Sequence, residues 1–260
     1  MPYPFVLSIP HCSHRVPDDI RPAIALTDKE ILESVDRGTG EIFGALPAAA
    51  VLRAEWSRLV VDLNRTPGRL DEKGVIAKTD YHGRRIFYRG SEPDKEQTED
   101  RIDMYYRPFH EKLSGRFENP GIKAIFDCHS LNGTGPRDAP DAGRKRSDIT
   151  LSNYGDGHGK RVPGAGGITC PPDTMNGIKE AFEKSGFSVS LNYPYRGGYI
   201  MYHYGHDFET TGKIGIQIEL NQDLYLDGSS HMSSKSRLAE VGKKIRDSFD
   251  AVARLFEGPL

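Results

Sequence analysis

Three apolar runs of this sequence each end at, or contain, one polar residue whose side chain could bind a metal ion or move a proton. One run ends just before His11, a second ends just before His129, and a third contains Glu219. A carboxylate among branched apolar residues is costly to desolvate, and burial raises its pKa. Such a pKa suits a general base that works near neutral pH. The three runs therefore predict an active site at the edge of a sheet, with Glu219 as its general base.

The two histidines are the strongest candidates for metal ligands. A hydrolytic zinc site takes three protein ligands from His, Asp and Glu and leaves one position for water. Either histidine alone could be an ordinary capped or surface residue, but together with Glu219 they favour a site for one Zn²⁺ ion. Two residues compete for the third position: His14 follows His11 by three residues, and Asp36 interrupts the apolar face of a predicted helix. Spacing alone does not decide between them.

Polar residues near these runs indicate an acidic substrate. Asn64 and Arg65 come just after an apolar run, and a guanidinium binds a carboxylate through two parallel hydrogen bonds. The alternative for Arg65 is a structural salt bridge, for example to Asp62. Arg89, in the basic and aromatic stretch 82–89, could hold a second acidic group of the substrate, although a solvated loop is the default for such a stretch.

The stretch 192–199 is a further candidate for the substrate site. Its glycine pair, which includes Gly198, indicates a tight turn where the backbone comes close to another group. Turn chemistry alone also explains such a pair. Because the stretch lies just before the apolar run that contains His203, we predict that Gly198 and His203 form one wall of the substrate site.

Apolar runs alternate with amphipathic stretches along the chain. The runs predicted as strands are 5–10, 51–52, 59–63, 122–126, 149–151, 189–191, 199–202 and 214–220. The stretches predicted as helices are 28–43, 101–117, 172–185 and 234–256. A capping box that begins at Thr27 opens the first of these helices. Two long polar segments are predicted as loops, 69–100 and 132–145.

This alternation predicts a single α/β domain over residues 1–260. We expect three layers, with a mostly parallel or mixed central sheet and helices on both of its faces. Ligands of such sheets bind at the carboxyl ends of the strands, which is where His11, Asn64, Arg65 and His129 fall.

The composition argues against several other classes of protein. A hydrophobic share of 37% and a charged share of 28% are ordinary for a soluble globular protein. The net charge of −2 gives no pull toward nucleic acid or an anionic membrane. No apolar stretch approaches the roughly 20 residues that a membrane helix needs, and the N-terminus has no signal-peptide pattern. Three widely spaced cysteines do not fit a disulfide framework. We therefore expect a cytoplasmic enzyme.

Six stretches of the sequence resemble the N-formylglutamate amidohydrolase family. This family is a branch of zinc-dependent hydrolases whose fold is similar to that of zinc carboxypeptidases, the phosphorylase/hydrolase-like fold. The stretches follow the order of the family and span nearly the whole chain: 8–11, 35–39, 57–65, 126–130, 192–199 and 217–221. The segments 132–145 and 158–170 are distinctive in this chain, which leaves the acyl group and the amino acid of the substrate open.

The resemblance implies hydrolysis of the amide bond of a small N-acyl acidic amino acid such as N-formyl-L-glutamate. It implies that the two histidines bind zinc, that Glu219 activates water, and that Asn64 and Arg65 hold the α-carboxylate of the substrate. It also favours Asp36 over His14 as the third ligand, because the family pattern has an acid there. The rival functions are a zinc peptidase or cell-wall amidase that uses the same site, and a non-catalytic protein that binds an acyl amino acid.

Overall fold

The strands of the protein form one six-stranded sheet in the order β2-β1-β3-β6-β4-β5. The computed structural model describes residues 1–137, 139–227 and 234–257. The strands are β1 (Tyr3–Ile9), β2 (Ala48–Arg53), β3 (Ala124–Leu131), β4 (Ile149–Ser152), β5 (Val189–Leu191) and β6 (Ile214–Asn221). Neighbours pair in parallel throughout, except that β4 is antiparallel to β6. The prediction of a mostly parallel or mixed sheet is confirmed.

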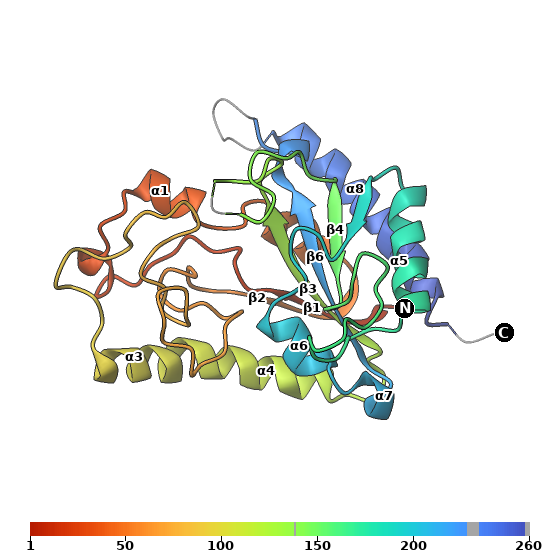
Figure 1. The fold of residues 1–260 in the computed structure, drawn as a ribbon, viewed down its shortest axis with the longest axis horizontal. Helices are drawn as coiled ribbons and strands as arrows, with labels where there is room; N and C mark the ends of the chain where they lie inside the picture. The colour runs from red at the N-terminus through yellow and green to blue at the C-terminus, as the bar shows by residue number, and fades with distance from the viewer. Residues whose placement is uncertain (138, 228–233, 258–260) are drawn as a thin grey trace.

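Helices cover both faces of this sheet (Figure 1). They are α1 (Asp28–Glu33), α2 (Thr39–Ile42), α3 (Lys95–Arg101), α4 (Arg107–Phe117), α5 (Pro172–Lys184), α6 (Tyr199–Gly205), α7 (Phe208–Thr211) and α8 (Lys235–Arg254). Buried residues of α2, α5 and α8 pack on one face of the sheet, and those of α4 and α6 pack on the other. The predicted three-layer α/β architecture is confirmed. None of the described helices is long and apolar enough to cross a lipid bilayer.

Successive residues of the central strands point to opposite faces of the sheet. Phe5 and Leu7 belong to the core under α8, whereas Val6 and Ile125 belong to the core under α4. Both faces are therefore buried, as is usual for parallel strands. His129 follows Ile125 by four residues and shares its face, so the polar end of β3 emerges on the side covered by α4 and α6.

The predicted strand 59–63 is wrong. This segment is buried, but within the described chain it forms no ladder with a strand. Val60 N donates to the Ser57 carbonyl in a turn, and Asp62 N donates to the Val75 carbonyl. A short apolar run indicates burial, and an irregular segment under other loops is buried as fully as a strand.

The predicted strand 199–202 is also wrong, because these residues form the start of α6. Aromatic residues such as Tyr199 favour strands in the absence of other contacts. Here the backbone N–H of Ile200 donates to the side-chain oxygen of Asn64 at 2.8 Å. This tertiary contact fixes the first turn of the helix and overrides the local preference.

The helix predicted over 28–43 is divided in two. The capping box at Thr27 is present, and α1 ends at Glu33. Gly38 has a φ of 81°, a left-handed conformation that breaks the helix before α2 begins. Asp36 consequently lies in a turn rather than on a helix.

The other predicted elements are present with shifted ends. The helix predicted over 101–117 is confirmed and begins earlier, because α3, a π-helical segment at Ile102–Tyr106 and α4 follow one another. The first predicted loop therefore ends where α3 begins, at Lys95. Long irregular segments on this side of the sheet supply most of the walls of the site.

Candidate metal centre and active-site cavity

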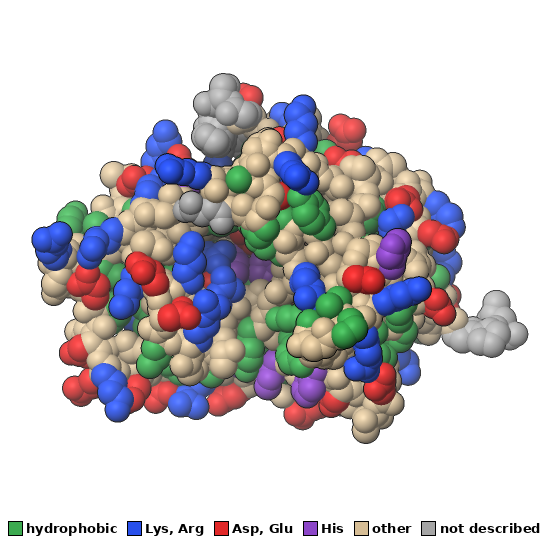
Figure 2. Space-filling view, in the orientation of Figure 1, with side chains coloured by type: hydrophobic (Ala, Val, Ile, Leu, Met, Phe, Trp, Pro, Cys, Tyr) green, Lys and Arg blue, Asp and Glu red, His purple; other side chains and the backbone are tan. Residues whose placement is uncertain are grey.

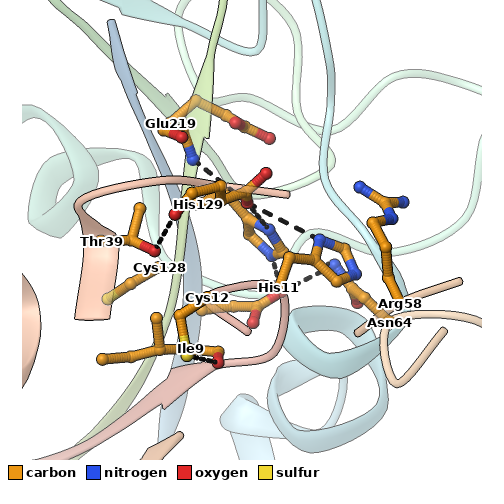
Figure 3. A network of polar contacts seen from close by, with 12 residues as sticks. Ile9, His11, Cys12, Thr39, Arg58, Asn64, Cys128, His129 and Glu219 are labelled. Carbon is orange, nitrogen blue, oxygen red and sulfur yellow. Dashed lines mark hydrogen bonds and ion pairs between the residues drawn. The ribbon is translucent and has the colours of Figure 1, made fainter. Parts of the chain in front are cut away.

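Three side chains from distant parts of the chain meet at the carboxyl edge of the sheet. His11 follows β1, Asp36 lies in the turn between α1 and α2, and His129 lies in β3. All three are buried, and their ligand atoms lie within 4.8 Å of one another. Asp36 Oδ2 is 3.6 Å from His11 Nδ1 and 3.0 Å from His129 Nδ1. The two imidazole rings are neighbours, with centroids 4.7 Å apart (Figure 3).

The far nitrogen of each imidazole is bound to a buried carboxylate. His11 Nε2 lies 2.7 Å from Asp62 Oδ1, and His129 Nε2 lies 2.8 Å from Asp127 Oδ2. Because an ionised carboxylate only accepts hydrogen bonds, Nε2 carries the hydrogen in the neutral form of His11, and Nδ1 of that ring keeps its lone pair. His129 has a carboxylate on each nitrogen, so its Nδ1 would give up a proton to a bound metal ion. A carboxylate on the far nitrogen is the usual support of an imidazole that binds zinc.

The donor set fits a zinc ion. His11 Nδ1 is buried and has no hydrogen-bond partner among the described residues, so its lone pair is available to a cation. Two imidazole nitrogens and one carboxylate oxygen form the three-ligand set of hydrolytic zinc enzymes, with a fourth position left for water. His14, the other candidate for third ligand, is exposed and is not part of the group that contains Asp36.

Four buried carboxyl groups surround the two histidines. The four are Asp36, Asp62, Asp127 and Glu219. Burial alone would raise the pKa of Asp36, but the adjacent imidazoles of His11 and His129 outweigh it and lower that pKa. Burial alone would lower the pKa of His129, but the charge of Asp127 outweighs it and raises that pKa well above its ordinary value. Such a set of charges favours a bound proton or a bound cation.

Glu219 stands next to this group on β6. It is the register partner of His129 on β3, and it lines the same cavity as the three metal-ligand candidates. Burial raises its pKa to about 8. Its Oε1 accepts a hydrogen bond from Gln217 Nε2 at 2.8 Å. A carboxyl group with this pKa can accept and return a proton near neutral pH.

The side chain of Asn64 links the site to α6. Its Nδ2 donates to Asp127 Oδ2 at 2.9 Å and lies 3.0 Å from His129 Nε2, while its Oδ1 accepts the Ile200 N–H. Gly198, the residue before α6, approaches the same amide so closely that an added Cβ would collide with it. Asn64 and Gly198 both line the cavity. Their contacts connect β3 to the start of α6 and so form the inner wall of the cavity.

Cationic side chains line one side of the cavity, which has a volume of about 310 Å³. Figure 2 shows a hollow near the centre of this face, with histidine atoms inside it and Lys and Arg side chains beside it. The cations are Arg58, Arg65 and Lys73. Arg58 Nη2 donates to Asp62 Oδ2 at 2.6 Å, and Arg65 Nη1 donates to the Asn64 carbonyl at 2.9 Å. Lys73 has no ion-pair partner among the described residues.

Two predicted substrate-site residues do not reach this cavity. Arg89 and His203 are exposed and are absent from its lining. Arg84, a neighbour of Arg89 in the same basic stretch, is bound to Glu33 and Asp80, each at 2.7 Å. The basic stretch 82–89 therefore connects neighbouring segments through the ion pairs of Arg84. The cations that line the cavity come from other segments.

The outer wall of the cavity is the loop between β3 and β4, braced by Arg146. Arg146 forms two hydrogen bonds with Asp141, at 2.6 and 2.8 Å, and one with the Asn132 carbonyl at 3.1 Å. It also donates to the hydroxyl groups of Tyr81 and Tyr195, each at 3.3 Å. One buried guanidinium thus joins three loops around the opening.

Several residues of the site were not predicted from the sequence. Asp127 and Gln217 each stand two residues before a predicted residue of the site, His129 and Glu219 respectively, so the period of a strand places them on the same face. That spacing was an available signal. For Lys73 there was no such signal, because nothing in a polar loop marks which lysine lines a cavity.

Comparisons with known proteins identify the family of this chain. The family model described as N-formylglutamate amidohydrolase matches residues 3–226. An N-formylglutamate deformylase of Pseudomonas putida is 26% identical over 254 residues, which cover 91% of this chain and 87% of the relative. One of Pseudomonas aeruginosa is 26% identical over 262 residues, which cover 93% and 89%.

A solved structure shares the fold. The crystal structure of an N-formylglutamate amidohydrolase from Ralstonia eutropha JMP134 superposes with a TM-score of 0.79 at 20% identity, covering 98% of this chain and 93% of that chain. The order of the six sequence stretches and the match over residues 3–226 lead to the same assignment. The chain belongs to the N-formylglutamate amidohydrolase family, which makes it a hydrolase that acts on an amide.

Proposed function

We propose that this chain hydrolyses the amide bond of N-formyl-L-glutamate, or of a closely related N-acyl acidic amino acid, with one bound Zn²⁺ ion. The names of the two Pseudomonas relatives, both N-formylglutamate deformylases, suggest the substrate class. The observation that carries the proposal is the buried group of His11, Asp36 and His129 in one cavity with Glu219.

The metal would be held by Nδ1 of each histidine and by the Asp36 carboxylate. When bound, the ion would act as a Lewis acid that polarises the amide carbonyl and lowers the pKa of a water molecule. Asp62 and Asp127 would keep both rings turned toward the ion through their hydrogen bonds to Nε2.

Glu219 would be the general base and then the general acid. It takes a proton from water as the water oxygen bonds to the formyl carbon. It returns that proton to the amide nitrogen as the carbon–nitrogen bond breaks, which yields formate and the free amino acid. The raised pKa of Glu219, about 8, suits both steps because the group can exchange a proton near neutral pH.

The cationic side of the cavity would select an acidic substrate. N-formyl-L-glutamate carries two carboxylates, and three cations line the cavity: Arg58, Arg65 and Lys73. We assign the α-carboxylate to Arg65 and the side-chain carboxylate to Lys73, whose ammonium group has no ion-pair partner among the described residues. Lys73 takes the role that the sequence suggested for Arg89. Asn64 contributes indirectly, because its amide is bound to Asp127 and Ile200.

The size of the cavity favours a single amino acid over a peptide. Its volume of about 310 Å³ lies at the lower end of the roughly 300–1,000 Å³ found for small-molecule sites. The loop braced by Arg146 forms its outer wall. A peptidase or a cell-wall amidase would need an open groove on both sides of the scissile bond.

The test is a substrate panel with metal analysis of the same protein sample. N-formyl-, N-acetyl- and N-succinyl-L-glutamate are compared with a peptidoglycan fragment. We expect one zinc ion per chain, the highest kcat/KM for N-formyl-L-glutamate, and loss of turnover on chelation that zinc restores. Cleavage of the peptidoglycan fragment without cleavage of any acylated glutamate would contradict the proposal.

A further inference from the structure

Gln217 is the buried neighbour of Glu219 on β6. The two residues are separated by one position, so their side chains share a face of the strand. Gln217 is only 4% exposed, and it lines the cavity. Its Nε2 donates to Glu219 Oε1 at 2.8 Å. The amide of Gln217 is therefore anchored at one end by the general base of the proposed reaction.

The side-chain oxygen of Gln217 makes no hydrogen bond with the described residues. When Glu219 is ionised, as it is when it acts as a base, its carboxylate only accepts hydrogen bonds, so the nitrogen of Gln217 must face it. That leaves Gln217 Oε1, which is buried and has no hydrogen-bond partner among the described residues. Buried carbonyl oxygens in folded proteins are nearly always paired, so this oxygen calls for a donor.

The neighbouring strands do not supply that donor. The register partners of Gln217 are Asp127 on β3 and Ser152 on β4. The carboxylate of Asp127 is itself an acceptor, and the Ser152 hydroxyl donates to the Tyr195 carbonyl at 2.8 Å. Neither register partner supplies the donor, and because Gln217 lines the cavity, a group bound there can supply it.

We infer that Gln217 Oε1 accepts a hydrogen bond from the N–H of the scissile amide. The inference rests on the proposed function. Glu219 has to exchange protons both with the water that attacks the acyl carbon and with the nitrogen bonded to that carbon. In an N-acyl amino acid this nitrogen carries one hydrogen, and the acceptor beside Glu219 is Gln217 Oε1. The substrate class is then a secondary amide, N-acylated on a primary amine.

This contact would also direct the final proton transfer. As the water oxygen bonds to the acyl carbon and the carbon–nitrogen bond breaks, the nitrogen becomes pyramidal and gains a lone pair. With its N–H held by Gln217, that lone pair turns toward Glu219, which delivers the proton taken from water. Gln217 is thus a substrate-binding residue that positions the leaving nitrogen against its acid.

The test compares N-formyl-L-glutamate with N-formyl-N-methyl-L-glutamate, which has the same two carboxylates but no N–H. In the wild-type protein we expect a strong preference for the first compound in kcat/KM. In Gln217→Met, which has a similar size and no acceptor oxygen, this preference should fall at least about tenfold, or about 1.4 kcal/mol. Gln222→Met is the matched control, because Gln222 also lines the cavity but donates to Ser130 Oγ. It should keep the wild-type preference.

An equal loss for both compounds in Gln217→Met would overturn the inference, because it would mean that Gln217 only supports Glu219. Circular dichroism and the melting temperature confirm that the variant is folded. If it is not, Gln217→Leu, which also lacks an acceptor oxygen, replaces it, and the preference should fall in the same way. A wild-type protein that hydrolyses neither compound would instead refute the proposed function.

Discussion

Glu219 and His129 stand side by side on β6 and β3, and both hold their protons to a higher pH than usual. Burial raises the pKa of Glu219 to about 8. Burial would lower the pKa of His129, but the carboxylate of Asp127 outweighs it and raises that pKa well above its ordinary value. Without a cation both side chains are therefore protonated near neutral pH. A divalent ion that binds His129 has to displace the proton of that ring, so its binding should weaken as the pH falls.

The first prediction concerns the chemical step. Glu219→Gln keeps the size of the side chain but cannot accept a proton, so kcat should fall by roughly 10²–10⁴-fold. The three metal-ligand candidates are untouched, and the zinc content measured by mass spectrometry should stay that of the wild type. His203→Ala, a change at an exposed residue outside the cavity, is the control and should leave kcat unchanged. A wild-type kcat in Glu219→Gln would contradict the role of Glu219 as the general base.

The second prediction uses the same variant to follow stability against pH in the metal-free protein. An unfolded glutamate has a pKa of about 4.3. Between that value and about 8, the folded protein therefore holds more protons at Glu219 than the unfolded chain does. Folding stability contributed by this residue consequently falls as the pH rises through this range. Glutamine does not titrate, so the stability of Glu219→Gln relative to wild type should increase from about pH 5 to about pH 8, by up to a few kcal/mol.

Urea denaturation of both proteins with a chelator present measures this difference. The other titrating groups are common to both proteins and largely cancel. A stability difference that stays constant over the range would show that Glu219 ionises in the folded protein as freely as in the unfolded chain.

The sequence predicts which side chains a strand brings to the edge of the sheet, but it does not predict which charged loop residues line the cavity. His11, His129 and Glu219 each follow or interrupt an apolar run, so their place at the sheet edge could be predicted. Arg89 and Lys73 are both cations in polar loops. Both are exposed, and only the folded loops determine that Lys73 lines the cavity whereas Arg89 does not.

At the scale of elements, the approach of α6 to the loop that follows β2 organises the inner wall of the site. Asn64 uses one side-chain group to hold Asp127 and the other to bind the backbone of Ile200 in α6. Gly198 leaves just enough room for that amide. The orientation of His129 therefore depends on where a helix begins.

The third prediction follows from this arrangement. Gly198→Ala places a methyl group against the Asn64 amide, which must move away from Asp127 or from Ile200. Because loss of a support of a metal-binding histidine weakens the metal site, zinc affinity should fall by roughly 10–100-fold. Competition with a coloured chelator measures this affinity. Gly68→Ala is the control, since an added Cβ there meets no atom within 4 Å. Equal zinc affinity in the two variants would contradict the role of Gly198.

The elements that the sequence misplaced are those whose shape depends on such contacts. Residues 199–202 form a helix because Asn64, far away in sequence, binds the first turn. Residues 59–63 are buried without pairing, because their backbone groups bond to Ser57 and Val75 instead of a strand. Where local signals were sufficient, as at the Thr27 capping box, the predicted start of the helix was correct.

At the scale of the whole molecule, the last helix completes the core around the first strand. The family match ends at residue 226, before α8 begins. Yet Phe249 of α8 is fully buried, and its ring lies 5.1 Å from that of Phe126 on β3 and 6.3 Å from that of Phe5 on β1. Helix α8 thus packs on the opposite face of the sheet from His11 and His129. We propose that residues 1–260 form a single domain.

The fourth prediction tests whether the chain unfolds as a single domain. Phe249→Ala leaves a cavity under the central strands and should lower the free energy of unfolding by about 3–5 kcal/mol. The single tryptophan, Trp56, lies beside Tyr105, far in sequence from α8, with ring centroids 5.9 Å apart. If the chain unfolds as one domain, Trp56 fluorescence and far-ultraviolet circular dichroism should give the same midpoint in wild type, and both should shift together in Phe249→Ala. Met104→Ala, at a side chain that is 63% exposed, should shift neither. A fluorescence midpoint that stays at the wild-type value while the dichroism midpoint falls would mean that α8 belongs to a separate folding unit.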